Sequence, residues 1–290
     1  MNGGKTNVAT VRAPAKINLY FHITGRRADG YHFVDSLVGF TTLADELTIR
    51  ADETLDVVSD GPFAENMPPA YKNLVYQAAQ LLADTARVQA RAHFTITKHL
   101  PVAAGIGGGS TDAAAALKAL MQLWGIAEDK VDLFKLGLTL GSDVPACLLA
   151  KATYASGIGE ILEPAPALPR AGILLVNPGV ALVTSSVFQA RRGGFNPPDR
   201  LTKSPKDARA LAAMLAERNN DLTDAAIRLC PVIRNVLEAL EAAPGCHLAR
   251  MTGSGATCFG IFDDLAAAEA AAPSVQQEGW WVAPTELDSP

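Results

Sequence analysis

The feature that most limits the possible folds of this chain is a glycine-rich segment, Pro101 to Gly109, between a predicted strand and a predicted helix. Residues 92–98 alternate apolar and polar side chains, which is typical of a strand, and an apolar stripe at helical spacing follows the glycines and stops at Gly125. We expect Ser110 or Thr111 to cap that helix. Backbone without side chains lets an anion approach closely, and the N–H groups and dipole of a helix start favour phosphate. The segment therefore predicts a phosphate-binding loop, with a flexible turn as the alternative.

Two common nucleotide-binding loops do not fit this segment. A Walker A loop closes on Gly-Lys-Ser/Thr, whereas the nearest lysine here, Lys98, precedes the glycines. A dinucleotide-binding fingerprint has a glycine where Ser110 stands, follows its strand directly, and is followed by an acidic residue about 20 positions later. The sequence therefore argues against a dinucleotide oxidoreductase.

Composition and charge narrow the classes of protein further. The 290 residues are 49% hydrophobic and 19% charged, which is typical of a compact protein of one large or two modest domains and not of a disordered chain. The net charge of -5 gives no basic field for nucleic acid or an anionic membrane. No secretory leader and no bilayer-length apolar run is evident, so we expect a cytoplasmic protein. The cysteines stand singly and the histidines lack metal-ligand spacing, so neither a disulfide framework nor a zinc site is expected.

Helical and strand patterns are mixed along the chain, which favours an α+β fold. Alternation within 11–24 places Lys16 and Asn18 on the same side of a strand. A polar, Pro/Gly-rich segment at 191–206 predicts a mobile loop. Further strands are predicted over 31–42, 46–58, 92–98 and 172–176, and as a strand–turn–strand over 246–262; helices are predicted over 71–86, 128–140, 207–217, 222–228 and 231–242.

Several motifs together resemble the GHMP kinase superfamily. Pro101 to Ala115 is similar to its P-x-x-x-G-L-G-G-G-S-S-x-A-A loop, with Ile106 for the usual leucine, and Met251 to Ala256 resembles its C-terminal glycine motif. Three further segments, 13–19, 25–32 and 141–145, are similar to those of the members that phosphorylate a cytidine-diphosphate-linked polyol in the non-mevalonate route to isoprenoids. The motifs run in family order from residue 13 to 262, so the resemblance covers nearly the whole chain.

The resemblance implies a fold, an activity and its reactants. The fold would be the two-domain GHMP kinase fold, with an N-terminal domain over 1–153 that contains a left-handed βαβ crossover, a C-terminal domain over 154–290, and the active site in the cleft between them. The activity would be phosphoryl transfer from ATP, with Mg²⁺, to a hydroxyl of a small molecule that carries a cytidine diphosphate group. The same resemblance implies a monomer or weak homodimer, with neither nucleic acid nor membrane as a partner.

Two residues match the superfamily's catalytic pair. Asp143 would accept the proton of the attacking hydroxyl, and Lys16 would orient Asp143 and add positive charge beside the transferring phosphoryl group. From the residues alone, Asp143 also fits a helix N-cap before Pro145, and Lys16 a solvent-facing strand lysine.

The resemblance also implies the residues that bind ATP and the acceptor substrate. Magnesium keeps most of its waters and binds through phosphates, so no metal ligands are named. Residues matched to ATP binding are Pro101, Gly105, Gly107, Gly108, Gly109, Ser110 and Thr111, with Lys98 and Asn73 beside the adenine; those matched to the acceptor are Asn18, Tyr31, His32, Thr184 and Phe188. Without the resemblance, the aromatic residues among them fit an ordinary core equally well.

Two other functions share much of this pattern. A homoserine or mevalonate kinase has the same loop and fold, although Tyr31, His32 and Lys16 argue against that alcohol specificity. A nucleotide-binding sensor without catalysis is the second, and the presence of both Asp143 and Lys16 argues against it. An assay of turnover distinguishes all three.

Overall fold

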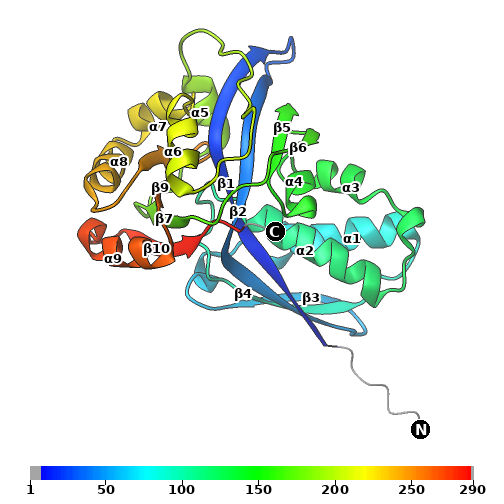
Figure 1. The fold of residues 1–290 in the computed structure, drawn as a ribbon. Helices are drawn as coiled ribbons and strands as arrows, with labels where there is room; N and C mark the ends of the chain where they lie inside the picture. The colour runs from blue at the N-terminus through cyan, green and yellow to red at the C-terminus, as the bar shows by residue number, and fades with distance from the viewer. Residues whose placement is uncertain (1–7, 289–290) are drawn as a thin grey trace. The chain divides into compact units, whose positions relative to one another are not determined.

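A computed structural model describes residues 8–288 of the chain, which form two compact units (Figure 1). Of the described residues, the first unit contains 8–15, 44–102 and 107–149, and the second contains 16–43, 103–106 and 150–288. Each unit is therefore assembled from separate stretches of chain. The division at residue 153 that the family resemblance implies stays a prediction.

Two long strands contribute to both units. β1 (Ala9–Arg26) pairs with β2 (His32–Arg50). The second half of β2, over residues 46–50, lies in the first unit, and its first half, over 34–38, lies in the second unit and pairs with β5 (Thr153–Gly157). The sequence predicts separate strands over 31–42 and 46–58, and this is wrong, because β2 continues without a break through Arg50. The alternation of apolar and polar residues does not show that one strand continues while the strands that pair with it change from β5 to β4.

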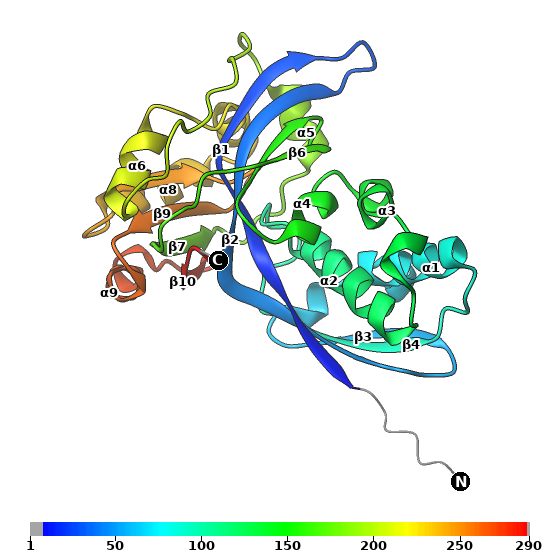
Figure 2. The same ribbon diagram turned by 45° about the vertical axis from the view of Figure 1, so that its right-hand side comes forward.

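In the first unit, helices pack along a sheet formed by the end of β2, β4 (Ala92–Thr97) and β3 (Leu55–Asp60). β3 and β4 are parallel and are joined through α1 (Leu74–Ala86), which makes the expected βαβ crossover; its left hand stays a prediction. Figures 1 and 2 show α1 and α2 lying along this sheet. The remaining helices of the unit are α2 (Gly108–Leu123), α3 (Leu133–Leu140) and α4 (Val144–Leu149), with single 3₁₀ turns at Ala64–Asn66, Ala70–Lys72 and Glu128–Lys130.

In the second unit, four antiparallel strands form a sheet in the order β10-β7-β9-β8. The strand β7 (Gly172–Asn177), one of the two inner strands, is buried throughout, which agrees with its unbroken apolar sequence. Figure 2 shows α8 (Val232–Ala242) and α9 (Leu265–Val275) beside this sheet, where both pack. The other elements are β6 (Ile161–Pro164), β8 (Leu248–Met251), β9 (Cys258–Phe262), β10 (Trp281–Glu286), α5 (Thr184–Ala190), α6 (Ala208–Ala216) and α7 (Thr223–Leu229).

Two predicted helix starts are corrected by the structure. α2 begins at Gly108, with Gly107 as its N-cap, so neither Ser110 nor Thr111 caps it. The Thr111 hydroxyl donates back to the carbonyls of Gly107 and Gly108, at 3.2 and 2.9 Å, which is the bonding of a residue already inside a helix. The predicted helix over 128–140 is shorter, because the Asp132 side chain accepts from Lys135 N and starts α3 there.

The segment over 191–206 is anchored at several points. Asn196 Nδ2 donates to Asp221 Oδ1 at 2.6 Å, and Leu201 N donates to the Tyr154 hydroxyl at 2.9 Å. Arg200 Nε lies 3.1 Å from Asp35 Oδ1, a fully buried carboxylate. These bonds argue against the mobility that its composition suggests.

The cysteines and the helix lengths agree with two expectations from the sequence. Cys147, Cys230, Cys246 and Cys258 are all free thiols. Within residues 8–288, no helix combines the length and the apolar character that a bilayer crossing requires.

Candidate active site

The start of α2 presents backbone N–H groups without a side-chain cap. Its N-cap, Gly107, adopts the left-handed conformation with φ of 66°, and no described side chain forms a capping bond there. By contrast, among residues 8–288 an Asn or Asp side chain accepts a first-turn N–H in four helices, α1, α3, α6 and α9, through Asn73, Asp132, Asp207 and Asp264. The first N–H groups of a helix have no partner within it, and the helix dipole makes this end positive. The α2 start can therefore accept an anion.

Packing against the protein does not explain two of the glycines at this helix start. An added Cβ on Gly108 or Gly109 would come no nearer than 3.5 Å to the surrounding atoms, which is ordinary contact. Glycine inside a helix costs about 1 kcal/mol relative to alanine. Their presence is consistent with space kept for a ligand against the backbone.

Gly105 has a different reason to be glycine. Its φ is 77°, and an added Cβ would overlap the carbonyl oxygen of Gly255, in the C-terminal glycine motif. Nearby, the Ala104 carbonyl accepts from the Thr257 hydroxyl at 2.6 Å, and the Ile106 carbonyl accepts from Lys16 N at 2.9 Å. Residues 103–106 are thus fastened to β1 and to the 252–257 turn within the second unit.

Beneath the start of α2 lies a buried cluster of one lysine and two aspartates. Lys98 Nζ donates to Asp45 Oδ2 and, at 2.9 Å, to Asp112 Oδ2. Asp45 Oδ1 also accepts from the backbone N–H groups of His99 and Leu100, at 2.7 and 2.9 Å. All three charged side chains are at most 2% exposed. The cluster joins the end of β4 and β2 to the first turns of α2.

The charges of this cluster are not balanced. Asp112 Oδ1 is buried and has no hydrogen-bond partner among the described residues. Burial raises the pKa of Asp112 to about 7, with Lys98 opposing that rise and Asp45 adding to it. The carboxylates of Asp45 and Asp112 raise the pKa of Lys98, against the effect of its burial. The predicted adenine contact of Lys98 stays a prediction, and the structure adds a clear role for its ammonium as the counterion of two carboxylates.

Asp45 is not among the site residues that the sequence predicts. Its only sequence signal is a charged residue between apolar neighbours in an extended segment, and only the fold shows that its side chain meets Lys98. Asn73, predicted beside the adenine, caps α1 by accepting from Val75 N at 2.9 Å. This capping bond uses its side-chain oxygen.

Lys16 and Asn18 face the same side of β1, as the alternation predicts. Both are 3% exposed, and Lys16 Nζ donates to Asn18 Oδ1 at 3.0 Å. Asn18 N donates to the Thr252 hydroxyl at 2.8 Å, and an added Cβ on Gly253 would lie 3.3 Å from Asn18 Oδ1. The C-terminal glycine motif therefore packs directly against this pair.

Two of the residues predicted to bind the acceptor's base, His32 and Phe188, lie close together. The His32 ring lies 5.4 Å from that of Phe188, which in turn meets the edge of Phe21 at 6.2 Å. Burial, followed by the charges of Arg26 and Arg191, lowers the pKa of His32 below its ordinary value. The imidazole is therefore neutral at pH 7 and offers one donor and one acceptor. Tyr31 is 63% exposed, which leaves its ring open to a partner.

The remaining predicted residues are also placed by the structure. The Thr184 hydroxyl, at the start of α5, lies 2.9 Å from the Ser254 hydroxyl. Asp143 is exposed and directly precedes α4, where its carbonyl accepts from Cys147 N at 3.2 Å. Pro101 and Ser110 are half-buried. Asp143 belongs to the first unit and Lys16 to the second, and their joint catalytic role stays a prediction.

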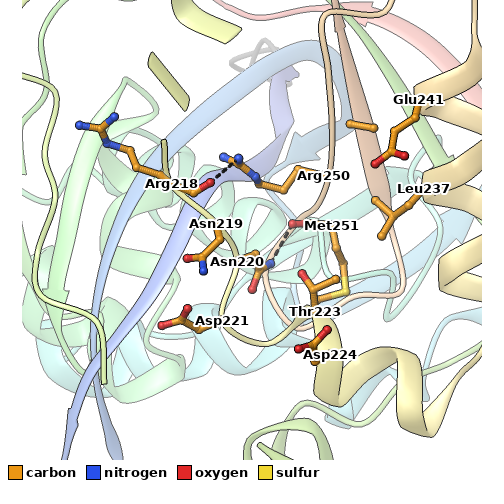
Figure 3. Close-up of a pocket in the computed structure, with 11 residues that line it drawn as sticks. Arg218, Asn219, Asn220, Asp221, Thr223, Asp224, Leu237, Glu241, Arg250 and Met251 are labelled. Atoms are coloured by element: carbon orange, nitrogen blue, oxygen red, sulfur yellow. Dashed lines mark hydrogen bonds between the residues drawn. The ribbon is translucent and has the colours of Figure 1, made fainter. Parts of the chain in front are cut away.

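A pocket of about 280 Å³ in the second unit contains none of the predicted site residues (Figure 3). In it, Arg250 donates to three backbone carbonyls, those of Leu19, Leu215 and Arg218, at 2.7, 2.8 and 2.6 Å. Burial and the nearby Arg218 lower the pKa of Arg250 to about 10. Asn220 Nδ2 donates to the Met251 carbonyl, as Figure 3 shows, at 2.8 Å. These groups brace β1 and the turn that follows β8, which indicates a structural role.

Comparison with known proteins agrees with this geometry. The family described as GHMP kinases N terminal domain matches residues 73–151, and the family described as GHMP kinases C terminal matches residues 201–279. The chain is 50% identical over 280 residues to a 4-diphosphocytidyl-2-C-methyl-D-erythritol kinase of Paramagnetospirillum magneticum, covering 96% of this chain and 98% of that one. It is 48% identical to the protein of the same name in Rhodospirillum rubrum, covering 95% and 91%.

Solved structures show the same relationship. A crystal structure of 4-(cytidine 5'-diphospho)-2C-methyl-D-erythritol kinase superposes with a TM-score of 0.79 and 34% identity, covering 97% of this chain and 100% of that one. A homoserine kinase from Cytophaga hutchinsonii superposes with a TM-score of 0.72 at 17% identity, covering 100% and 98%, which shows a shared fold. With both family domains matched and near relatives aligned along almost its whole length, the chain belongs to the GHMP kinase family.

Proposed function

We propose that this protein transfers the γ-phosphoryl group of ATP to the 2-hydroxyl of 4-diphosphocytidyl-2-C-methyl-D-erythritol, giving the 2-phosphate and ADP. The relatives named for this substrate support the proposal. The observation that carries the kinase chemistry is the start of α2, where a glycine N-cap leaves first-turn N–H groups uncapped. Such a helix start suits the phosphates of a nucleotide.

In this proposal the glycine loop holds ATP and two side chains act on the reacting groups. Asp143 orients the acceptor hydroxyl and takes its proton as the oxygen bonds to the γ-phosphorus and the bond to the leaving ADP oxygen breaks. Lys16, held by Asn18 Oδ1 at 3.0 Å, supplies positive charge to the transferring phosphoryl group. Mg²⁺ belongs to the proposal as the partner of the ATP phosphates, with no protein ligands assigned. Within residues 8–288, no three His, Cys, Asp or Glu side chains form a group that could hold a metal.

Recognition of the cytosine would divide between stacking and hydrogen bonding. Phe188, with the open ring of Tyr31, supplies aromatic faces that accept any base. The neutral imidazole of His32 can donate and accept, and cytosine and uracil differ in the polarity of their ring edges. A desolvated mismatch costs about 1–3 kcal/mol per group, which corresponds to roughly ten- to hundredfold selectivity.

The test is an ATP-dependent kinase assay with this substrate beside homoserine, mevalonate and the uridine analogue of the substrate. We expect turnover with the cytidine substrate, strong preference over its uridine analogue, and none with homoserine or mevalonate. Turnover of homoserine or mevalonate alone supports another GHMP kinase activity, and nucleotide binding without turnover supports a sensor. Phe188→Ala should raise KM for both pyrimidine substrates alike, whereas His32→Ala should reduce the cytidine-to-uridine ratio of kcat/KM. If that ratio is already one in the unmodified protein, the assignment of the cytosine site is wrong.

Variants separate the catalytic residues from the nucleotide loop. Asp143→Asn should lower kcat by about 10² or more while the Kd of ATP, measured by calorimetry, stays unchanged. Gly107→Val should abolish ATP binding, because a branched residue at φ of 66° is strained and, in this proposal, the side chain adds bulk where a phosphate approaches the backbone. A folded Asp143→Asn variant with normal kcat reduces Asp143 to a structural residue, and unchanged ATP affinity in Gly107→Val contradicts the loop assignment.

A further inference from the structure

The Ser36 hydroxyl has two neighbours that fix the direction of its hydrogen bonds. Ser36 lies on β2, is 1% exposed, and its Oγ donates to the Tyr20 carbonyl at 2.6 Å. Its other neighbour, Asn18 Nδ2, lies 2.8 Å away. A serine hydroxyl carries one hydrogen, and a carbonyl oxygen can only accept. Because the hydrogen is given to Tyr20, Ser36 must accept from Asn18.

This direction determines which way the Asn18 amide faces. An acceptor at Ser36 holds the Nδ2 end of the amide, so the Oδ1 end faces Lys16 Nζ at 3.0 Å. If the amide turned over, its NH₂ group would point at an ammonium, where two sets of donors oppose each other. Asn18 is also held at its backbone by Thr252. The amide is therefore locked with its oxygen toward the lysine.

We propose that Ser36 is a positioning residue for phosphoryl transfer, which orients the Asn18 amide and so holds the Lys16 ammonium for the reaction. This inference rests on the proposed function, in which Lys16 acts on the transferring phosphoryl group. Ser36 is linked to Lys16 through Asn18 and lies outside every motif that identified the family. The same geometry gives Asn18 a role in holding Lys16 beside its predicted contact with the substrate.

Ser36→Ala removes the acceptor and leaves the shape of the side chain nearly unchanged. We expect kcat to fall about tenfold, which corresponds to weakening the one charge-assisted hydrogen bond between Lys16 and Asn18. KM for ATP and KM for the acceptor should each change by less than about twofold. Ser36→Thr retains the hydroxyl and should restore kcat. If Ser36→Ala does not fold, Ser36→Cys replaces it with the same expectation, since a thiol accepts hydrogen bonds weakly.

Thr285→Val provides the matched control. Its hydroxyl is also buried in the second unit, where it accepts from Leu43 N at 2.9 Å and lies 3.0 Å from the Thr42 hydroxyl. We expect this variant to lose stability similarly, as measured by Tm, and to keep its kcat. A fall in kcat that tracks Tm in both variants alike would show that Ser36 acts through stability alone and would overturn the proposal.

A second readout reports on the amide itself. In ¹⁵N NMR spectra, the side-chain NH₂ signals of Asn18 are identified by their loss in Asn18→Asp. We expect these signals to shift in Ser36→Ala and to return toward their original position in Ser36→Thr, because only the threonine restores the acceptor. Unmoved signals in Ser36→Ala would contradict the proposed lock.

Lys16→Met distinguishes failure of this inference from failure of the proposed function. Turnover at the unmodified rate in Lys16→Met would overturn the inference, since Lys16 would then have no catalytic role to support, while the turnover itself would uphold the kinase activity. Absence of turnover in the unmodified protein would overturn the proposed function. An inactive Lys16→Met combined with unchanged kcat and unmoved NH₂ signals in Ser36→Ala would overturn the role of Ser36 and leave the kinase assignment intact.

Discussion

Replacing Lys98 with methionine tests how the start of α2 is held in place. The substitution keeps a side chain of similar length in a site that is 2% exposed and removes the ammonium that joins two carboxylates. Asp45 keeps its two backbone donors, at 2.7 and 2.9 Å. Asp112 loses the lysine that binds Oδ2, and its Oδ1 already has no described partner. The penalty should therefore fall mainly on Asp112.

The size of the penalty follows from leaving a buried charge without its partner, which costs about 3–5 kcal/mol. Its pH dependence follows from the pKa of Asp112, which burial raises to about 7. A carboxyl with a raised pKa binds more protons in the folded state than in the unfolded state, so its contribution to stability is complete below about pH 4 and is lost as pH rises through about 7. Without Lys98 the pKa of Asp112 rises further, and the loss extends to higher pH. The Lys98→Met penalty should thus be small near about pH 5 and clearly larger near about pH 8.

Urea denaturation followed by circular dichroism at both pH values measures this penalty as a change in the free energy of unfolding. Lys130→Met serves as the control, because Lys130 is 71% exposed and its carboxylate partner, Asp129, is 4.0 Å away. An exposed pair of this kind contributes at most about 1 kcal/mol. Adding Asp112→Asn to Lys98→Met should recover part of the loss near about pH 8, since the uncompensated charge is then gone. A Lys98→Met variant within about 1 kcal/mol of the unmodified protein at that pH would refute the reasoning.

Two further substitutions test how parts of the second unit are held. Gly105→Ala should destabilise the protein by more than the roughly 1–2 kcal/mol of a left-handed alanine, because its Cβ overlaps the Gly255 carbonyl. The control is Gly125→Ala, at φ of 63° with no atom within 4 Å of the added Cβ, which should cost only the conformational strain. Equal losses of Tm in the two variants would contradict the overlap. Arg200→Met removes the guanidinium that lies 3.1 Å from the fully buried Asp35. We therefore expect limited proteolysis to cleave the segment over 191–206 faster in this variant. An unchanged cleavage rate would show that this ion pair does not anchor the segment.

Where local periodicity decided an element, the sequence predicted it closely. The strand predicted over 92–98 is β4 (Ala92–Thr97), and the helix predicted over 231–242 is α8 (Val232–Ala242). In both, burial of alternate or stripe positions is enough to define the element. The prediction that Lys16 and Asn18 lie on one face of β1 is confirmed for the same reason, since side chains two residues apart on a strand point the same way.

Errors arose where the backbone, and not side-chain periodicity, sets the boundary. The sequence predicts the α2 start at Ser110 or Thr111, because these residue types usually cap helices. The structure uses the left-handed Gly107 instead, and it thereby leaves the first-turn N–H groups without a side-chain partner. The family motif pointed to the correct loop, but it does not state which residue begins the helix.

The amino-acid sequence by itself determined the family, the α+β class and the loop that suits a phosphate, because these depend on motif order, on short-range periodicity and on glycine. Only the tertiary structure brought Asp45 to Lys98, 53 residues apart in the chain, and Ser36 to Asn18, 18 residues apart. The residues next to Asp45 and Ser36 in the sequence do not indicate that either side chain bonds to a distant one. The direction of the Ser36 hydrogen bond, and with it the orientation of the Asn18 amide, follows from atoms on two different strands. Such pairings depend on strand register and burial, which long-range packing decides.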